Sequence, residues 1–185
     1  MSRVCVFFAN GFEEIEALTV VDILRRANVI VHMVSVTGEK KVTGSHNIVV
    51  EANQLIEEVD FEQTDMIVLP GGMPGTANLE ACEPLMKQVD AFFAEGKYIA
   101  AICAAPSILG HRGMLQGKKA CSSPGFESHL EGAAVKKKPV VVAGQIITSR
   151  GMGTAIPFGL AILEQLKDKN AVAQMKDKIV FKTKW

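Results

Sequence analysis

The order of apolar runs and helical patterns along the chain places the strongest constraint on its fold. Residues 4–8 form an apolar run of strand length followed by a helical pattern over 13–27, and the run at 98–102 is followed by a helical pattern from Ala104 or Ala105. Strands that are apolar on both faces are typical of parallel sheets covered by helices. The alternation therefore predicts an α/β fold with a doubly wound, mostly parallel sheet sandwiched by helices.

The remaining segments fit the same architecture. Further strands are expected at 29–36 and 65–69, hairpins within 38–50 and 140–149, helices within 79–94, 154–166 and 170–178, and a short extended piece at 179–181. The sequence has no internal repeat and no linker long enough to separate two domains. We therefore expect a single domain over residues 1–185.

The balance of acidic and basic residues limits the classes of molecule that the protein is expected to bind. The 185 residues include 20 Lys and Arg and 20 Asp and Glu, which gives a formal net charge of zero. This balance offers no electrostatic reason to expect binding to nucleic acid or to an anionic membrane. The first nine residues resemble neither a secretory signal nor a membrane span. We expect a cytoplasmic protein whose partner is a small molecule or a second copy of the chain.

The four cysteines do not form a metal-binding pattern. Cys5, Cys82, Cys103 and Cys121 include no C-x-x-C pair, and none has a histidine at ligand spacing. No metal site is therefore predicted. Free thiols also suit a reducing compartment.

Cys103 is the best candidate nucleophile. It follows the apolar run at 98–102, and alanines stand two positions before and after it, which is the spacing of a nucleophile elbow between a strand and a helix. A thiol at a helix N-terminus faces unpaired N–H groups, so we expect a pKa below the ordinary value of about 8.5. The alternative is a buried strand cysteine that acts as a small hydrophobe.

Glu16 is the carboxylate most in need of an explanation. Within the helical pattern at 13–27, Glu13 and Glu16 project into the apolar arc, whereas Glu14 falls at its polar edge. Acidic residues favour the first turn of a helix, which accounts for Glu13 and Glu14. Burial of Glu16 would raise its pKa and let it hold a proton near Cys103 at neutral pH.

Backbone N–H groups could complete the site. Gly71 and Gly72 follow the strand expected at 65–69, and Ala104 follows Cys103. Their N–H groups could stabilise an oxyanion. The alternative for the two glycines is a turn that merely ends the strand.

No histidine can be assigned as a base for Cys103. The next residue is Ala104, and His111 would lie about 12 Å away along a helix. His32 falls inside a predicted strand, and His129 lies in a loop that cannot be placed. His46, in the hairpin at 38–50, could lie over the site or over a neighbouring subunit.

Four motifs resemble the DJ-1 branch of the ThiJ/PfpI superfamily. They are GFEEIEA at 11–17, VLPGG at 68–72, AAICAAP at 100–106 and TSRGMGT at 148–154. The resemblance covers nearly the whole chain, with the motifs in the family's order. It implies a flavodoxin-like fold and a homodimer with each site near the subunit interface. It also implies that Cys103 is the reactive nucleophile and that Glu16 is its protonated partner.

The chain departs from the family pattern at two positions. Relatives with peptidase character carry a histidine directly after the cysteine, where this chain has Ala104, and several others keep a histidine where this chain has Ser123. Both differences weaken a protease assignment, and either Ser122 or Ser123 could replace the missing histidine as a hydrogen-bond partner of the thiol. The resemblance further implies that His46 and Arg26 stand at basic positions near the site.

Three functions follow from the resemblance. The first is a glyoxalase or deglycase that acts on small 2-oxoaldehydes or their adducts through Cys103 and Glu16, without metal or cofactor. The second is a redox-sensing stress protein or chaperone whose Cys103 is oxidised to sulfinate. The third, a cysteine peptidase, lacks a base.

Overall fold

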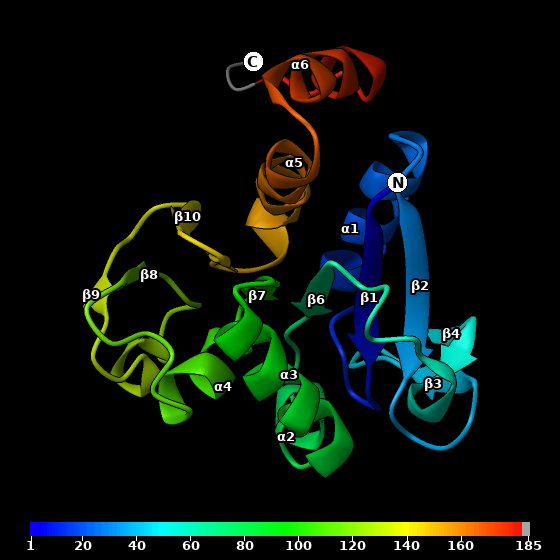
Figure 1. The fold of residues 1–185 in the computed structure, drawn as a ribbon, viewed down its shortest axis with the longest axis vertical. Helices are drawn as coiled ribbons and strands as arrows, with labels where there is room; N and C mark the ends of the chain where they lie inside the picture. The colour runs from blue at the N-terminus through cyan, green and yellow to red at the C-terminus, as the bar shows by residue number, and fades with distance from the viewer. Residues whose placement is uncertain (183–185) are drawn as a thin grey trace.

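A computed structural model describes residues 1–182, so the last three residues of the predicted domain lie outside the described part of the chain. Its central sheet contains seven strands: β1 (Arg3–Phe8), β2 (Ile30–Ser35), β5 (Gln54–Leu55), β6 (Met66–Leu69), β7 (Tyr98–Ile102), β10 (Val140–Ala143) and β11 (Ile146–Ser149). Their order is β10-β11-β7-β6-β1-β2-β5 (Figure 1). All neighbours are parallel except β10 and β11, which form an antiparallel hairpin. The predicted α/β architecture is confirmed.

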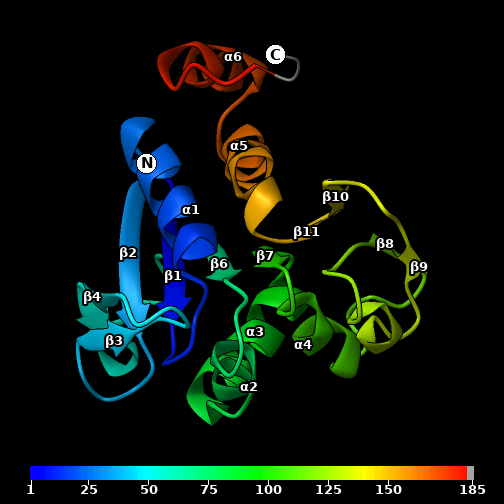
Figure 2. The same cartoon turned by 180° about the vertical axis from the view of Figure 1, so that it is seen from behind.

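Helices cover both faces of this sheet. The side chains of β1 alternate between the two sides: Val4, Val6 and Phe8 join one apolar cluster, and Cys5 and Phe7 join the other. The first cluster includes residues of α1 (Glu14–Arg26), α5 (Ala155–Leu166) and α6 (Lys169–Lys178). The second includes residues of α2 (Gly75–Glu80), α3 (Glu83–Glu95) and α4 (Pro106–His111) (Figure 2).

Short elements lie outside the central sheet. The hairpin expected within 38–50 forms from β3 (Lys41–Thr43) and β4 (Val49–Glu51), beside the carboxyl ends of β1 and β2 (Figure 1). The other short elements are β8 (Lys119–Ala120), β9 (Ala134–Val135) and the 3-10 helices η1 (Ile56–Glu58), η2 (Glu127–His129) and η3 (Met152–Thr154). No helix within residues 1–182 combines the length and apolar character that a membrane crossing requires.

Three boundaries differ from the sequence-based expectation. Helix α4 begins at Pro106, not at Ala104 or Ala105, because proline lacks an N–H and suits the first helical position. Helix α2 begins at Gly75, before the expected start of 79. The predicted extended piece at 179–181 is wrong, since α6 ends in a turn in which Val180 has φ of 55°.

The topology brings the candidate motifs to one edge of the sheet. Strands β1, β6 and β7 are adjacent and parallel, so their carboxyl ends point the same way. Gly71 follows β6, Cys103 follows β7, and α1 begins shortly after β1. Active sites of doubly wound folds lie at this edge.

Candidate active site

Cys103 occupies a sharp turn between β7 and α4. Its φ of 66° lies in the left-handed region, which non-glycine residues adopt rarely and mainly where surrounding contacts enforce it. Two such contacts are present: the Cys103 N–H donates to Ser149 O at 3.0 Å, and the Ser123 N–H donates to Cys103 O at 2.9 Å. The partly buried thiol is therefore held by strands and loops from both sides.

Glu16 lies in the first turn of α1 and is 1% exposed. Its Oε2 accepts a hydrogen bond from the Gly71 N–H at 3.0 Å. Burial raises the pKa of Glu16 to about 7 with help from the charge of Glu13, against the lowering effects of the nearby Cys103 side chain and the Gly71 N–H. Near neutral pH this carboxyl can therefore both accept and release a proton.

Gly71 allows Glu16 and Cys103 to approach each other. A Cβ at position 71 would lie 2.5 Å from Cys103 Cβ and 2.7 Å from Glu16 Oε2, both shorter than real Cβ contacts. A side chain there would push the carboxyl and the thiol apart. The Gly71 turn thus shapes the site, and it does more than end β6.

The three predicted oxyanion donors differ in what they contact. The Gly71 N–H donates to Glu16 and is therefore occupied, which corrects its predicted role. The Gly72 N–H lies near enough to Cys103 to lower the pKa of its thiol. Within residues 1–182, no hydrogen bond engages the N–H of Ala104, so this group is the donor best placed to contact an oxyanion.

Ser123 is the loop residue that reaches the thiol. Its side chain acts to lower the pKa of the Cys103 thiol, in addition to the backbone contact already described. Ser122 instead donates from Oγ to its neighbour's carbonyl at 3.3 Å. Ser123 therefore stands at the position where the sequence lacks the histidine of other relatives.

The expected low pKa of Cys103 is wrong. Burial and the Glu16 carboxylate raise the pKa of Cys103 to about 11, although the Ser123 side chain and the Gly72 N–H act in the opposite direction. Two features explain the difference. Helix α4 has only six residues and begins three positions after Cys103, which weakens the stabilising field expected from its N-terminus. An ionised Glu16 also opposes a second negative charge on the thiol.

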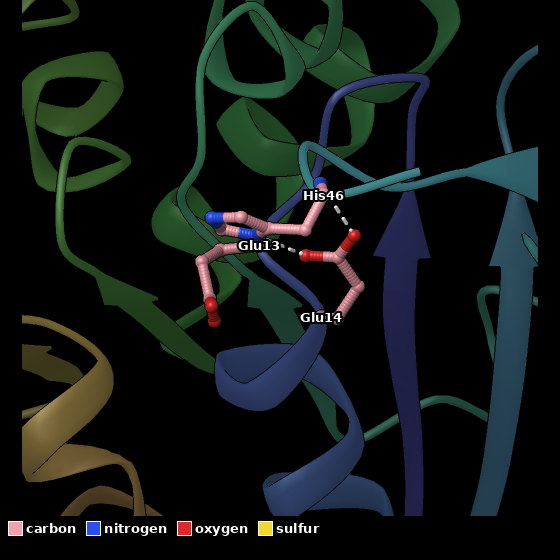
Figure 3. Close-up of side chains that lie close together, drawn as sticks. All are labelled: Glu13, Glu14 and His46. Atoms are coloured by element: carbon pink, nitrogen blue, oxygen red, sulfur yellow. Dashed lines mark hydrogen bonds and ion pairs between the residues drawn. The ribbon is translucent and has the colours of Figure 1, made fainter. Parts of the chain in front are cut away.

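Glu14 forms a second carboxylate contact at the start of α1 (Figure 3). It is 2% exposed, and it accepts from the His46 N–H at 2.7 Å, from His46 Nδ1 at 2.8 Å and from Ser45 Oγ at 3.3 Å. Burial acts to raise the pKa of Glu14, but the two bonds from His46 and backbone hydrogen bonds of Glu14 and Ile48 lower it to about 2. Glu14 therefore anchors the turn between β3 and β4.

Comparisons with known proteins agree with this geometry. The model of the DJ-1/PfpI family matches residues 2–165. The chain belongs to the DJ-1/PfpI family. It is 36% identical over 182 residues to Protein DJ-1 homolog B of Arabidopsis thaliana, covering 97% of this chain and 42% of that protein. It is 34% identical to the Glutathione-independent glyoxalase DJ-1 of Schizosaccharomyces pombe, covering 92% of this chain and 94% of that protein.

Solved DJ-1 structures share the whole fold. A structure named Toxoplasma gondii DJ-1, oxidized, superposes with a TM-score of 0.94 at 36% identity, covering 98% of this chain and 99% of that chain. The chain spans under half the length of the two Arabidopsis DJ-1 homologues that it matches. The flavodoxin-like architecture expected of the DJ-1/PfpI family is thus present here.

The two basic residues expected from the family pattern each pair with an acidic side chain other than Glu16. His46 lies beside Glu13 and Glu14 (Figure 3), and Glu14 raises the pKa of His46 through a hydrogen bond and its charge. Arg26 is the last residue of α1, about 15 Å along the helix from Glu16, and it pairs with Asp22 at 2.5 Å. Within a single chain Arg26 is therefore not a contact of the site.

One group of side chains has metal-ligand chemistry near the site. Single ligand atoms of Glu13, Glu14 and His46 all lie within 4.8 Å of one another. Both Glu14 oxygens already accept hydrogen bonds, and Glu13 Oε2 accepts from the Glu16 N–H at 2.6 Å. These contacts make the group a structural anchor for α1.

Proposed function

We propose that this protein is a cysteine-dependent, cofactor-free glyoxalase or deglycase that acts on small 2-oxoaldehydes or their adducts. The observation that carries the proposal is the close approach of the buried Glu16 carboxyl to Cys103 on either side of Gly71, together with a Glu16 pKa of about 7. A base with that pKa can take the thiol proton and later return it. The relative named a glutathione-independent glyoxalase supports this choice of chemistry.

The first step would be addition of the thiol to the aldehyde. Ionised Glu16 takes the proton of Cys103 while the sulfur forms a bond to the aldehyde carbon. The electron pair of the C=O bond moves to oxygen, which Glu16 then protonates to give a hemithioacetal. The Ala104 N–H would stabilise the negative charge on that oxygen.

The second step would be an internal redox exchange between two carbons. Glu16 removes the hydrogen of the former aldehyde carbon as a proton, and the electron pair forms an enediol. Return of the proton to the neighbouring carbon gives a thioester of a 2-hydroxy acid, which water hydrolyses to release the acid and the thiol. One carbon is oxidised and its neighbour is reduced, so the reaction needs no external oxidant.

Lactate formation from methylglyoxal tests this proposal. We expect chelator-treated protein to form lactate, and we expect Cys103→Ser and Glu16→Gln to lower the rate at least about 100-fold. Cys82→Ser is the matched control, since Cys82 lies at the start of α3 and takes no part in the site. Equal rates in the wild type and Cys103→Ser would overturn the proposal for this substrate.

A second candidate function is a thiol sensor. Cys103 is partly exposed, whereas Cys5 and Cys121 are fully buried, so oxidants reach Cys103 more easily. The carboxyl of Glu16 could also donate a hydrogen bond to an oxidised sulfur. We do not propose a peptidase, because the residue after Cys103 is Ala104 and because His46 and His111 are hydrogen-bonded to Glu14 and Glu80.

We further propose that the chain is a single cytoplasmic domain that forms a homodimer and binds neither nucleic acid nor membrane. Ile15, Met152 and Ile156 are 48%, 56% and 38% exposed and line one hollow of about 490 Å³ between α1 and α5. Apolar side chains gathered in this way are typical of interaction surfaces. The balanced net charge supports the exclusion of nucleic acid.

A further inference from the structure

Three side chains on the α2–α4 side of the molecule form a continuous hydrogen-bonded chain. Glu80 ends α2, His111 ends α4 and His129 ends η2. His111 Nδ1 lies 2.7 Å from Glu80 Oε1, and His111 Nε2 lies 3.1 Å from His129 Nδ1. The His111 and Glu80 side chains are 34% and 33% exposed, so solvent ions can reach them. These three hydrogen-bonded side chains take no part in the proposed reaction of Cys103.

The backbone holds the two imidazoles at this separation. A Cβ at Gly110 would lie 1.9 Å from His129 O, so α4 and η2 touch at a point that only glycine allows. The rings of His111 and His129 meet edge to face with centroids 5.3 Å apart. Phe126 packs beside His129 with ring centroids 5.9 Å apart. The two nitrogens are therefore positioned by packing as well as by their mutual hydrogen bond.

The protonation state of His111 follows from its neighbour. The Glu80 carboxylate has no proton to donate, so His111 Nδ1 carries a hydrogen and donates it to Glu80. In a neutral His111 the other nitrogen, Nε2, then has a free lone pair. This lone pair faces His129 Nδ1, and one proton is enough to bridge the two nitrogens.

We propose that His111 Nε2 and His129 Nδ1 bind a divalent transition-metal ion of the Zn²⁺, Ni²⁺ and Cu²⁺ class. The ion would replace the bridging proton and take water at its remaining positions. Two nitrogens bound to tetrahedral Zn²⁺ at about 2.0–2.1 Å lie about 3.3 Å apart, close to the 3.1 Å between these nitrogens. Imidazole nitrogens favour this class of ion over Mg²⁺, which prefers oxygen ligands.

Glu80 would act on the ion only through His111. A ligating histidine commonly donates its second N–H to a carboxylate, which fixes the ring and raises the basicity of the ligating nitrogen. The 2.7 Å contact between Glu80 and His111 has this arrangement. We therefore assign Glu80 as a positioning residue and not as a ligand.

The proposed ion would join two segments that flank the Cys103 turn. His111 ends the helix that follows Cys103, and η2 follows the loop whose Ser123 N–H donates to Cys103 O. A link between His111 and His129 would tie α4 to that loop. Ion binding should therefore raise the thermal unfolding midpoint of the protein.

Isothermal titration of the purified chain with ZnCl₂ tests the site. We expect one ion per chain in the wild type, and we expect His111→Ala and His129→Ala each to weaken that binding at least 100-fold. Glu80→Gln should weaken it about tenfold, since an amide is a weaker acceptor for the His111 N–H. MgCl₂ should give no saturable binding. His46→Ala and Cys103→Ser are matched controls and should keep the wild-type affinity.

Several results would overturn the proposal. Unchanged affinity in both His111→Ala and His129→Ala would do so, and so would absence of binding by the wild type. Loss of binding in His46→Ala would show that the ion binds at Glu13, Glu14 and His46 instead. Loss of binding in Cys103→Ser would show that it binds at the thiol. NMR of the folded wild type provides a check independent of variant stability: ZnCl₂ should shift the imidazole signals of His111 and His129 and not that of His32.

Discussion

At the scale of single residues, the chemistry of the site depends on how Glu16 and Cys103 share one proton. Burial raises the pKa of both groups, to about 7 for Glu16 and about 11 for Cys103. The carboxyl therefore ionises first as pH rises. An ionised carboxylate next to a neutral thiol is the arrangement of a general base with its nucleophile.

The pH dependence of the reaction should report the ionisation of Glu16. The raised pKa means that Glu16 is protonated below about pH 7 and becomes a base above it. We expect kcat/KM for methylglyoxal to rise with pH through about 7 in the wild type. The profile of Glu16→Gln should be low and flat over the same range. A wild-type profile with no inflection between pH 6 and 8 would contradict the assignment of Glu16 as the base.

Oxidation by peroxide should separate Cys103 from the two buried thiols, Cys5 and Cys121. We expect mass spectrometry after limited treatment to find sulfinate at Cys103 before Cys5 and Cys121, because both are fully buried. Glu16→Asp should reduce the sulfinate yield more than Glu16→Gln, since glutamine keeps a donor at the same reach and aspartate withdraws it by one methylene. Uniform oxidation of the cysteines would argue against a sensor role.

At the scale of elements, the strands could be predicted because their apolar runs bury both faces. The apolar arc of α1 marked Glu13 and Glu16 alike, and the resemblance to the DJ-1/PfpI family selected Glu16. The burial of Glu14 could not be predicted, because the groups that donate hydrogen bonds to it come from the β3–β4 turn, some thirty residues further along the chain. The pKa of Cys103 could not be predicted from the sequence either, because it depends on where α4 begins and on how close the Glu16 carboxyl lies to the thiol.

The contact between Glu14 and the β3–β4 turn should stabilise the fold in a pH-dependent way. The pKa of Glu14 is lowered to about 2 in the folded chain, so its contribution is fully present above its ordinary value of 4.5 and is lost as pH falls toward 2. We expect Glu14→Gln to lower the free energy of unfolding by about 2 kcal/mol at pH 7, with a smaller difference at pH 3.

Urea denaturation at both pH values measures this effect. Glu57→Gln is the control, because Glu57 is an exposed glutamate, and it should change the free energy of unfolding by less than about 0.5 kcal/mol. Equal effects of Glu14→Gln at pH 7 and pH 3 would show that the charge of Glu14 is not what stabilises the turn.

At the scale of the whole molecule, Glu16 lies close to the segment that precedes η3. Glu16 lies in the first turn of α1, and a Cβ on Gly151, just before η3, would come within 3.8 Å of Glu16 Oε1. The exposed Ile15 and Met152 belong to these same two segments. A second chain docked on Ile15 and Met152 would therefore lie near the Glu16 carboxyl.

Sedimentation equilibrium should detect this second chain. We expect a mass near twice the 19.9 kDa of one chain at micromolar concentration, and we expect Ile156→Glu to shift it toward the monomer by burying a charge in the apolar contact. Val142→Glu is the matched control: Val142 is 44% exposed but lies on β10, the edge strand that Figure 1 shows away from α1. It should leave the mass unchanged. A wild-type mass of one chain would contradict the homodimer, and equal dissociation by both variants would place the contact elsewhere.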